Sequence, residues 1–206
     1  DSGTALISLF ESGQSDLLSA ATTVTSNSTS ISEAVTFNDS ADPISALVDS
    51  YQLSSSAEAI IATTPLTVIQ AQAVVGVTST AHRIDDFFSA INDSIGDSAI
   101  TTATSINALA ESVAEAVQIA GSVSSPITTY KMANTIDPDD YLAINMEKAE
   151  AVLGASNSID FKSGLSISDS VTEIVTNSDV ITSNSISSTA VHATGATLSD
   201  ALNMLN

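Results

Sequence analysis

The spacing of apolar residues first indicates a helix at residues 67–76. Its apolar positions fall on one face at helical spacing: Val68, Ala71, Val74 and Val75. Thr67 precedes this face as a candidate N-cap, and Gln70, three residues later, completes a capping box. Gly76 follows the last apolar position, where helices often end in a left-handed residue. The pattern predicts a short, complete helix.

Two segments upstream of this helix read as strands. Val35 and Phe37 alternate with polar residues, which is typical of a half-buried strand. Residues 58–64, EAIIATT, are short and rich in β-branched side chains, which favours a buried strand. Between the two segments, Asp42 precedes Pro43, the order expected at a helix start. The predicted order is therefore strand, helix, strand, helix.

The C-terminal part of the chain suggests the same order again. The alternation that begins at Leu165 runs into Asp169, as the earlier alternation runs into Asp39. Thr197 resembles Thr67 as a helix cap, with an acidic residue three positions later. Asp39 and Thr67 are 28 residues apart, and so are Asp169 and Thr197. This equal separation predicts an internal repeat.

A degenerate copy is expected in the middle of the chain. Residues 104–120 have the spacing of a single amphipathic helix, with Ile106, Leu109, Val113 and Val117 on one face. We therefore expect four segments, which are the end of a preceding unit, a first unit, a degenerate second unit with an insertion, and a third unit: 1–30, 31–83, 84–156 and 157–206.

The expected fold is α/β, a repeat with a solenoid-like stack of short parallel strands flanked by short helices. Each predicted helix face is narrow, so neighbouring units would have to complete its core. The alternative is one compact α/β domain with an internal duplication.

The repeated motifs resemble the tandem-repeat regions of very large secreted bacterial surface proteins of the adhesin type. Three sets of residues carry the resemblance: Asp39-Ser40-Ala41 with Ile44, Leu66-Thr67 with Gln70-Ala71, and the weaker Asp169-Ser170 with Ile174. It covers about two thirds of the chain. The resemblance implies an extracellular adhesive or structural role and implies no catalytic residues.

Composition narrows the function further. The chain is 43% hydrophobic, with a mean hydropathy of +0.28, so it is expected to fold. Its net charge of −20, with only four Lys and Arg residues, disfavours binding to nucleic acid or to anionic lipid. No cysteine is present, and no apolar run is long enough for a membrane span. Because the sequence opens at Asp1 without Met, we expect a processed product or a piece of a longer protein.

The residues that usually carry catalysis are scarce. His82 and His192 are the only histidines. We expect His82 to be a solvated residue in a polar connection, and His192 to be a partly buried or edge residue within a strand. No Gly-x-Ser-x-Gly elbow and no phosphate-binding glycine loop occurs. The sequence therefore predicts a protein that is not an enzyme.

Clustered carboxylates are the remaining candidates. Paired carboxylates suffice for glycoside hydrolysis, and three groups qualify: Asp85 with Asp86, Asp93 with Asp97, and Asp137 with Asp139 and Asp140. Helix capping is the preferred interpretation, since Asp137 precedes Pro138 at a predicted helix start. No cofactor is expected, although oxygen-rich loops leave calcium as a candidate metal. Its candidate ligands are Asp93, Asp97, Asp137, Asp139 and Asp140.

These observations predict a non-enzymatic structural or adhesive repeat module of an extracellular, cell-surface protein, acting as a stalk, scaffold, lattice or filament subunit. The alternative is a glycan- or ligand-binding module of a secreted protein; a carbohydrate-active enzyme is a third reading. The expected partners are neighbouring repeats or further copies of the chain, with surface glycans as another candidate class. Asn-x-Ser/Thr sequons occur at Asn27, Asn38 and Asn92.

Overall fold

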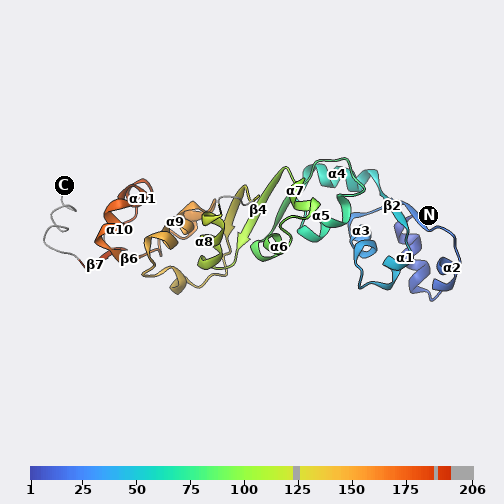
Figure 1. The fold of residues 1–206 in the computed structure, drawn as a ribbon, viewed down its shortest axis with the longest axis horizontal. Coiled ribbons are helices and arrows are strands. Elements are labelled where there is room, and N and C mark those ends of the chain that lie inside the picture. The colour runs from blue at the N-terminus through green and yellow to red at the C-terminus, as the bar shows by residue number, and fades with distance from the viewer. Residues whose placement is uncertain (123–125, 188–189, 196–206) are drawn as a thin grey trace. The chain divides into compact units, whose positions relative to one another are not determined.

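A computed structural model describes residues 1–122, 126–187 and 190–195 (Figure 1). The chain divides into two compact units, Asp1–Ile106 and Asn107–Asn206. Within each unit, short helices alternate with short strands, and the strands pair in parallel in small sheets. The coarse α/β prediction is therefore confirmed, and each unit is described by itself below.

The first unit contains short helices along its whole length. The helices are α1 (Gly3–Glu11), α2 (Ser15–Ser19), α3 (Ile31–Asn38), η1 (Pro43–Ala46), α4 (Ser55–Thr63), α5 (Val68–Val74), α6 (Phe88–Asp93) and α7 (Ser98–Thr101). The strands are β1 (Thr25–Thr29), β2 (Ser50–Leu53) and β3 (Arg83–Phe87).

The second unit uses the same kinds of element. Strand β4 (Ser105–Ala110) spans the boundary between the units and leads into the second. It is followed by α8 (Val113–Gly121), β5 (Thr129–Met132), η2 (Pro138–Tyr141), α9 (Met146–Gly154), η3 (Ser158–Asp160), β6 (Ile167–Ser170), α10 (Val171–Thr176), α11 (Ser178–Ser183) and β7 (Val191–Thr194).

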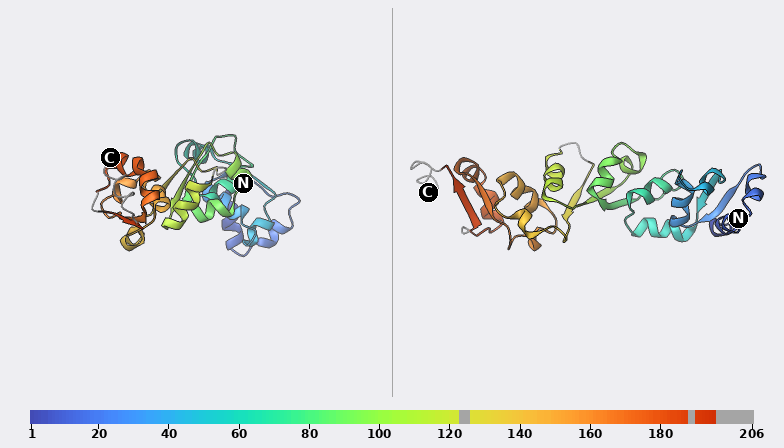
Figure 2. Two further views of the ribbon diagram at one scale, coloured as in Figure 1. Left: turned by 60° about the vertical axis from the view of Figure 1, so that its left-hand side comes forward. Right: turned by 90° about the horizontal axis from the view of Figure 1, so that it is seen from below.

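Each parallel strand pair is joined by a helical crossover, as parallel pairing requires. Strands β1 and β2 pair with Thr25 opposite Ser50, and helix α3 lies between them in the chain. Strands β4 and β5 pair with Asn107 opposite Thr129, and α8 connects them. Strands β6 and β7 run side by side at the red end of the ribbon (Figure 2). The strand-helix-strand turn is thus the recurring building block.

Helix pairs cover these strands. Helix α3 packs against α5 in the first unit, and α8 packs against α9 in the second (Figure 1). Helices α3 and α8 begin in the same way. The Ser30 hydroxyl accepts a hydrogen bond from the Glu33 amide, and the Ser112 hydroxyl accepts one from the Glu115 amide, both 3.2 Å long. Such side-chain caps satisfy amides that the helix itself leaves without acceptors.

The cores are built from aliphatic residues with a few aromatic rings. In the first unit, one buried cluster consists of Leu6, Leu18, Val24, Phe37 and Ile44. The Phe37 ring lies 5.8 Å from the Tyr51 ring, centroid to centroid. In the second unit, Tyr141 and Phe161 meet edge to face at 5.7 Å. Burial of these side chains supplies the main driving force for folding.

Local capping predictions are confirmed. Helix α5 begins after Thr67, whose hydroxyl accepts from the Gln70 amide at 3.3 Å, while the Gln70 side chain accepts from the Thr67 amide at 3.0 Å. Asp42 caps η1 through the Ile44 amide at 3.1 Å. The predicted strand positions of Ile167 and His192 also lie in strands, β6 and β7.

Two strand predictions are wrong, because both segments are helical. Val35 and Phe37 lie in α3, where the capping box at Ser30 fixes a helical start. Residues 58–64 fall mainly in α4, which Ser54 caps by accepting from the Ala57 amide. In both places a favourable cap, joined in α4 by three alanines, outweighs the weak strand preference of the apolar residues.

The long amphipathic helix predicted over residues 104–120 is also wrong. It is strand β4 followed by helix α8, and the burial in β4 alternates with Ile106, Ala108 and Ala110 inside. Gly76 does not adopt the left-handed conformation expected of it, since the glycines with positive φ in the described residues are Gly13, Gly96 and Gly195.

The predicted repeat with a spacing of 28 residues is wrong as well, because its first anchors have different local structures. Asp39 follows the end of a helix, whereas Asp169 lies in strand β6, so the two residues do not correspond. Thr197 and the acidic residue expected to complete its capping box lie outside the described residues. The expected boundaries near residues 31, 84 and 157 stay predictions.

Candidate functional site

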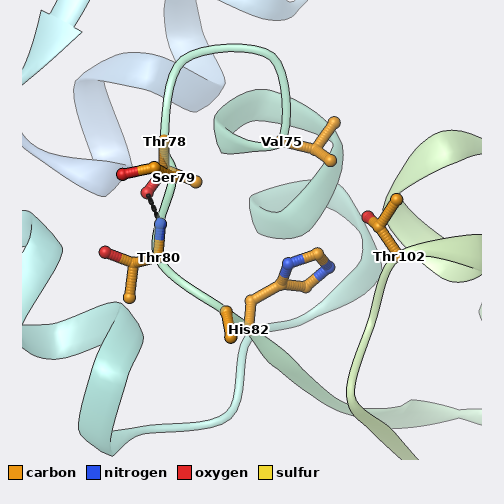
Figure 3. Close-up of a pocket in the computed structure, with 7 residues that line it drawn as sticks. Val75, Thr78, Ser79, Thr80, His82 and Thr102 are labelled. Atoms are coloured by element: carbon orange, nitrogen blue, oxygen red, sulfur yellow. Dashed lines mark hydrogen bonds between the residues drawn. The ribbon is translucent and has the colours of Figure 1, made fainter.

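A pocket in the first unit surrounds His82, between the end of α5 and the start of β3 (Figure 3). Its volume is about 260 Å³, large enough for a few water molecules or a small polar ligand. The lining residues come from three short segments: Val75, Thr78 to His82, and Thr102. Because His82 lines this pocket, the pocket is the candidate site for chemistry that uses a histidine.

His82 itself is a core residue. Its side chain is only 3% exposed, and its Nε2 lies 2.8 Å from the carbonyl oxygen of Ala99. In the tautomer with a hydrogen on Nε2, the ring donates this bond. The His82 carbonyl oxygen accepts from both the amide and the hydroxyl of Thr104, each at 2.9 Å. The expectation of a solvated His82 is therefore wrong.

The second unit explains why a buried side chain is needed at this position. His82 precedes Ile84 by two residues, and Leu165 precedes Ile167 by two residues. Ile84 and Ile167 occupy corresponding places in β3 and β6, and Leu165 is buried like His82. His82 thus fills a core position that leucine fills in the other unit.

Two hydroxyl groups on the pocket wall, those of Thr78 and Thr80, already have hydrogen-bond partners. Glu58 of α4 accepts hydrogen bonds through Oε2 from the Thr78 hydroxyl at 2.6 Å and from the Thr80 hydroxyl at 2.5 Å. The Thr78 hydroxyl also accepts from the Thr80 amide at 3.0 Å. These bonds hold the loop that follows α5 against α4, which is a structural task.

The five predicted calcium ligands occupy helix ends. Asp93 is the last residue of α6, and Asp97 is the cap residue of α7, where its carboxylate accepts from the Gln72 side chain at 2.7 Å. Asp137 caps η2 through the Asp139 amide at 3.0 Å, and Asp140 follows in the same turn. Among residues 1–122, 126–187 and 190–195, no three His, Asp or Glu side chains are grouped as metal ligands. The capping interpretation of Asp137 is confirmed.

Two carboxylates that the sequence analysis did not single out for this role join strands to helices. Asp86, in β3, accepts at Oδ2 from the Val68 amide, the first residue of α5, at 2.8 Å. Asp169, in β6, accepts at Oδ2 from the Met146 amide, the first residue of α9, at 2.9 Å. The second oxygen of each carboxylate accepts from the next amide in its own strand, that of Phe87 at 2.8 Å or Ser170 at 2.7 Å.

We call each of these arrangements a carboxylate joint: an aspartate in a strand, bonded to the first amide of the helix that precedes the strand in the chain. The backbone beside each joint is also the same. Leu66 pairs in parallel with Ile84, and Ile144 pairs in parallel with Ile167. Hydrogen bonds from the Met146 and Ser170 amides lower the pKa of Asp169 below its ordinary value of 3.8. The joint therefore favours the ionised carboxylate.

A second contact recurs with the joint, and we call it the tyrosine clamp. The Tyr51 hydroxyl of β2 donates to the Ala73 carbonyl oxygen at 2.5 Å, and the Tyr130 hydroxyl of β5 donates to the Ala151 carbonyl oxygen at 2.5 Å. Ala73 and Ala151 are both the sixth residue of their helix, α5 or α9. Burial raises the pKa of both tyrosines above 10.0.

The two strand pairs that contain the clamp tyrosines are also each joined by a side-chain hydrogen bond. The Thr25 and Ser50 hydroxyls meet across β1 and β2 at 3.2 Å, and the Thr129 hydroxyl donates to the Asn107 side chain across β4 and β5 at 2.9 Å. The short sequences SYQL and TYKM, around the two clamp tyrosines, are the signal that could have revealed this correspondence.

Comparisons with protein-family models, curated proteins and solved structures gave no match. Within the described ranges, no helix has both the length and the apolar character needed to cross a bilayer.

Proposed function

We propose that this chain is a structural repeat module of an extracellular surface protein, built from stacked strand-helix turns and serving as a stalk or scaffold. One observation carries the proposal: the carboxylate joint and the tyrosine clamp occur once in each unit, in the same order along the chain. Tyr51 and Tyr130 are 79 residues apart, and Asp86 and Asp169 are 83 residues apart. A duplicated set of packing contacts is typical of repeat proteins.

The use made of polar side chains supports the same role. Glu58, Asp86 and Asp169 all bind backbone amides or hydroxyls of their own unit. Their hydrogen bonds fix helices and loops in place, which rigidifies a thin aliphatic core. A module that must transmit force or keep its length benefits from such ties.

The aromatic residues favour a scaffold over a glycan-binding module. All eight Phe and Tyr residues lie in the described ranges, and Phe87, at 46% exposure, is the only one of them that is exposed. Sugar rings bind by stacking on exposed aromatic faces, and a single face is a poor platform for a chain of sugars. The resemblance of the repeats to surface proteins, together with the acidic composition, supports the extracellular assignment.

Pulling on the full chain between two handles tests the mechanical role. We expect two separate unfolding events, each releasing roughly 300 Å of chain, since about 100 residues extend by about 3.3–3.6 Å each. Tyr51→Phe should lower the unfolding force of one event only, and Tyr130→Phe that of the other. A chain that extends without a force peak contradicts the proposal.

Two further measurements address location and ligand. Antibodies raised against the chain should label intact cells of the producing organism, and protease treatment of those cells should remove the label. Label found only after lysis contradicts the surface assignment. A rise of the thermal midpoint with a soluble oligosaccharide would favour the glycan-binding alternative instead.

A further inference from the structure

The first residues of the first unit have the same local structure as residues 169 and 170 of the second unit. Asp1 and Ser2 precede α1 as Asp169 and Ser170 precede α10. Each serine caps its helix by accepting from the amide three residues later, at 3.2 Å in both cases. The fourth residue after each cap, Leu6 or Ile174, is buried.

The strand pairing at this point agrees with that correspondence. Ser2 pairs in parallel with Ser28 of β1, and the Asp1 carbonyl oxygen accepts from the Asn27 amide at 2.8 Å. In the second unit, Ser170 stands opposite Thr194 in the pairing of β6 with β7, and Asp169 stands opposite the residue before Thr194. Asp1 is therefore placed beside its neighbouring strand as Asp169 is.

Asp1 differs from Asp86 and Asp169 in the contacts of its carboxylate. The carboxylates of Asp86 and Asp169 each accept from the first amide of a helix. The side chain of Asp1 is exposed and has no hydrogen-bond partner among the described residues.

We propose that the edge formed by Asp1 and Ser2 is a docking surface for the start of a helix from a further repeat of this design. The occupant is defined by the two occupied joints: an apolar residue, a Thr or Asn cap and an apolar first helical residue, as in Leu66-Thr67-Val68 and Ile144-Asn145-Met146. A carboxylate at a helix N-terminus also meets the positive end of the helix dipole. The inference rests on the proposed structural role.

Neither occupied joint of a second copy could fill this edge without breaking. Val68 and Met146 already donate their amides to Asp86 and Asp169 of their own chain. The fitting partner is therefore a repeat whose helix start is free, and the observed spacing suggests how to supply it. Met146 and Asp169 are 23 residues apart, so a copy of residues 141–168 placed directly before Asp1 brings the same helix start to the same distance.

The test compares the native chain with this extended chain by residue-resolved amide hydrogen exchange. We expect docking to slow exchange in α1 and at Asn27 about tenfold, which corresponds to about 1.4 kcal/mol of added local stability. Asp1→Asn should remove most of the gain in the extended chain and have little effect in the native chain. Unchanged exchange on extension would overturn the proposal.

A matched variant isolates the hydrogen bond itself. Met146→Pro within the added copy removes the donor amide, yet proline is well accepted at the first position of a helix. We expect this variant to lose the protection, and equal protection would overturn the proposed joint. The pulling and labelling experiments do not depend on this edge, so a failed extension with two unfolding events would reject the docking surface and leave the structural role standing.

Discussion

The hydroxyl of Tyr130 donates a hydrogen bond to the carbonyl oxygen of Ala151, which ties strand β5 to the middle of helix α9. Tyr51 makes the same contact with α5 in the first unit. In both units a tyrosine on a short strand holds down a helix that packs mainly through alanine and valine. Because such small side chains give a thin core, the polar tie should contribute measurably to stability.

Removing the tyrosine hydroxyls should destabilise each unit separately. We expect Tyr51→Phe and Tyr130→Phe each to lower the free energy of unfolding of its unit by about 1 kcal/mol, the usual net value of one hydrogen bond. Urea denaturation followed by a probe in each unit measures this. Tyr141→Phe is the control, since within the part of the chain that the structure describes no hydrogen bond ties the Tyr141 hydroxyl to a helix, and an equal loss there would contradict the clamp.

The clamp tyrosines also predict an alkaline limit. Burial raises the pKa of both phenols, so the folded state holds the proton more strongly than the unfolded state. Their contribution to stability is complete below pH 10 and is lost as the pH rises through the higher folded-state pKa. The double variant Tyr51→Phe, Tyr130→Phe should therefore lose less stability than the native chain between neutral and strongly alkaline pH.

Gly76 and Gly154, each eight residues after the first residue of α5 or α9, make a matched pair. A Cβ on Gly154 would lie 2.8 Å from the Tyr130 hydroxyl oxygen, whereas a Cβ on Gly76 would meet nothing within 4 Å. We expect Gly154→Ala to cost roughly 1–3 kcal/mol through this overlap. Gly76→Ala should be neutral or stabilising by up to about 1 kcal/mol. Thermal or urea unfolding measures both.

A double-mutant cycle identifies the cause of the Gly154 effect. In a Tyr130→Phe background the overlapping oxygen is absent, so Gly154→Ala should cost much less than in the native chain. If the cost is the same in both backgrounds, the hydroxyl of Tyr130 does not lie where the structure has it.

Asp169 predicts an acid limit for the second unit. Its folded-state pKa is lowered, because the ionised carboxylate accepts from the Met146 and Ser170 amides. The joint therefore adds stability above the ordinary pKa of 3.8 and loses it as the pH falls through the lowered value. Asp169→Asn should flatten the loss of stability below about pH 4. Asp179→Asn is the control, since the Asp179 carboxylate is exposed and has no hydrogen-bond partner among the described residues; equal flattening there would contradict the joint.

His82 should behave as a core residue under substitution. We expect His82→Ala to lower the free energy of unfolding by roughly 2–4 kcal/mol, through a cavity and an unpaired Ala99 carbonyl oxygen. His192→Ala, on the exposed strand β7, should change it by less than about 0.5 kcal/mol. Urea unfolding of both variants tests this prediction, because a histidine that serves function and not packing could be replaced without a large loss in the free energy of unfolding.

Some of the fold could be predicted from the sequence because its cause is local. The caps at Thr67 and Asp137 each depend on residues two or three positions away. The helix at residues 55–63 could not be told from a strand by its apolar spacing, since two adjacent isoleucines fit both. The aspartate motifs 28 residues apart do not mark the repeat, because the corresponding contacts of the two units lie 78 to 83 residues apart.

The carboxylate joint and the tyrosine clamp could not be predicted from the sequence for a different reason. Asp86 and Val68 are 18 residues apart, but Asp169 and Met146 are 23 apart, because the loops between them differ in length. The clamp separations also differ, 22 residues for Tyr51 and 21 for Tyr130. Contacts made through folded loops of unequal length leave no fixed period along the chain.

The most direct test of the shared design is residue-resolved amide exchange in the full native chain. Val68 and Met146 are first residues of helices, and such amides exchange quickly when nothing accepts from them. We expect both amides to be protected, whereas those of Ile69 and Glu147, one position further, should exchange fast. Asp86→Ala should remove the protection of the Val68 amide only, and Asp169→Ala that of the Met146 amide only. Val68 and Met146 amides that exchange as fast as those of Ile69 and Glu147 would contradict it.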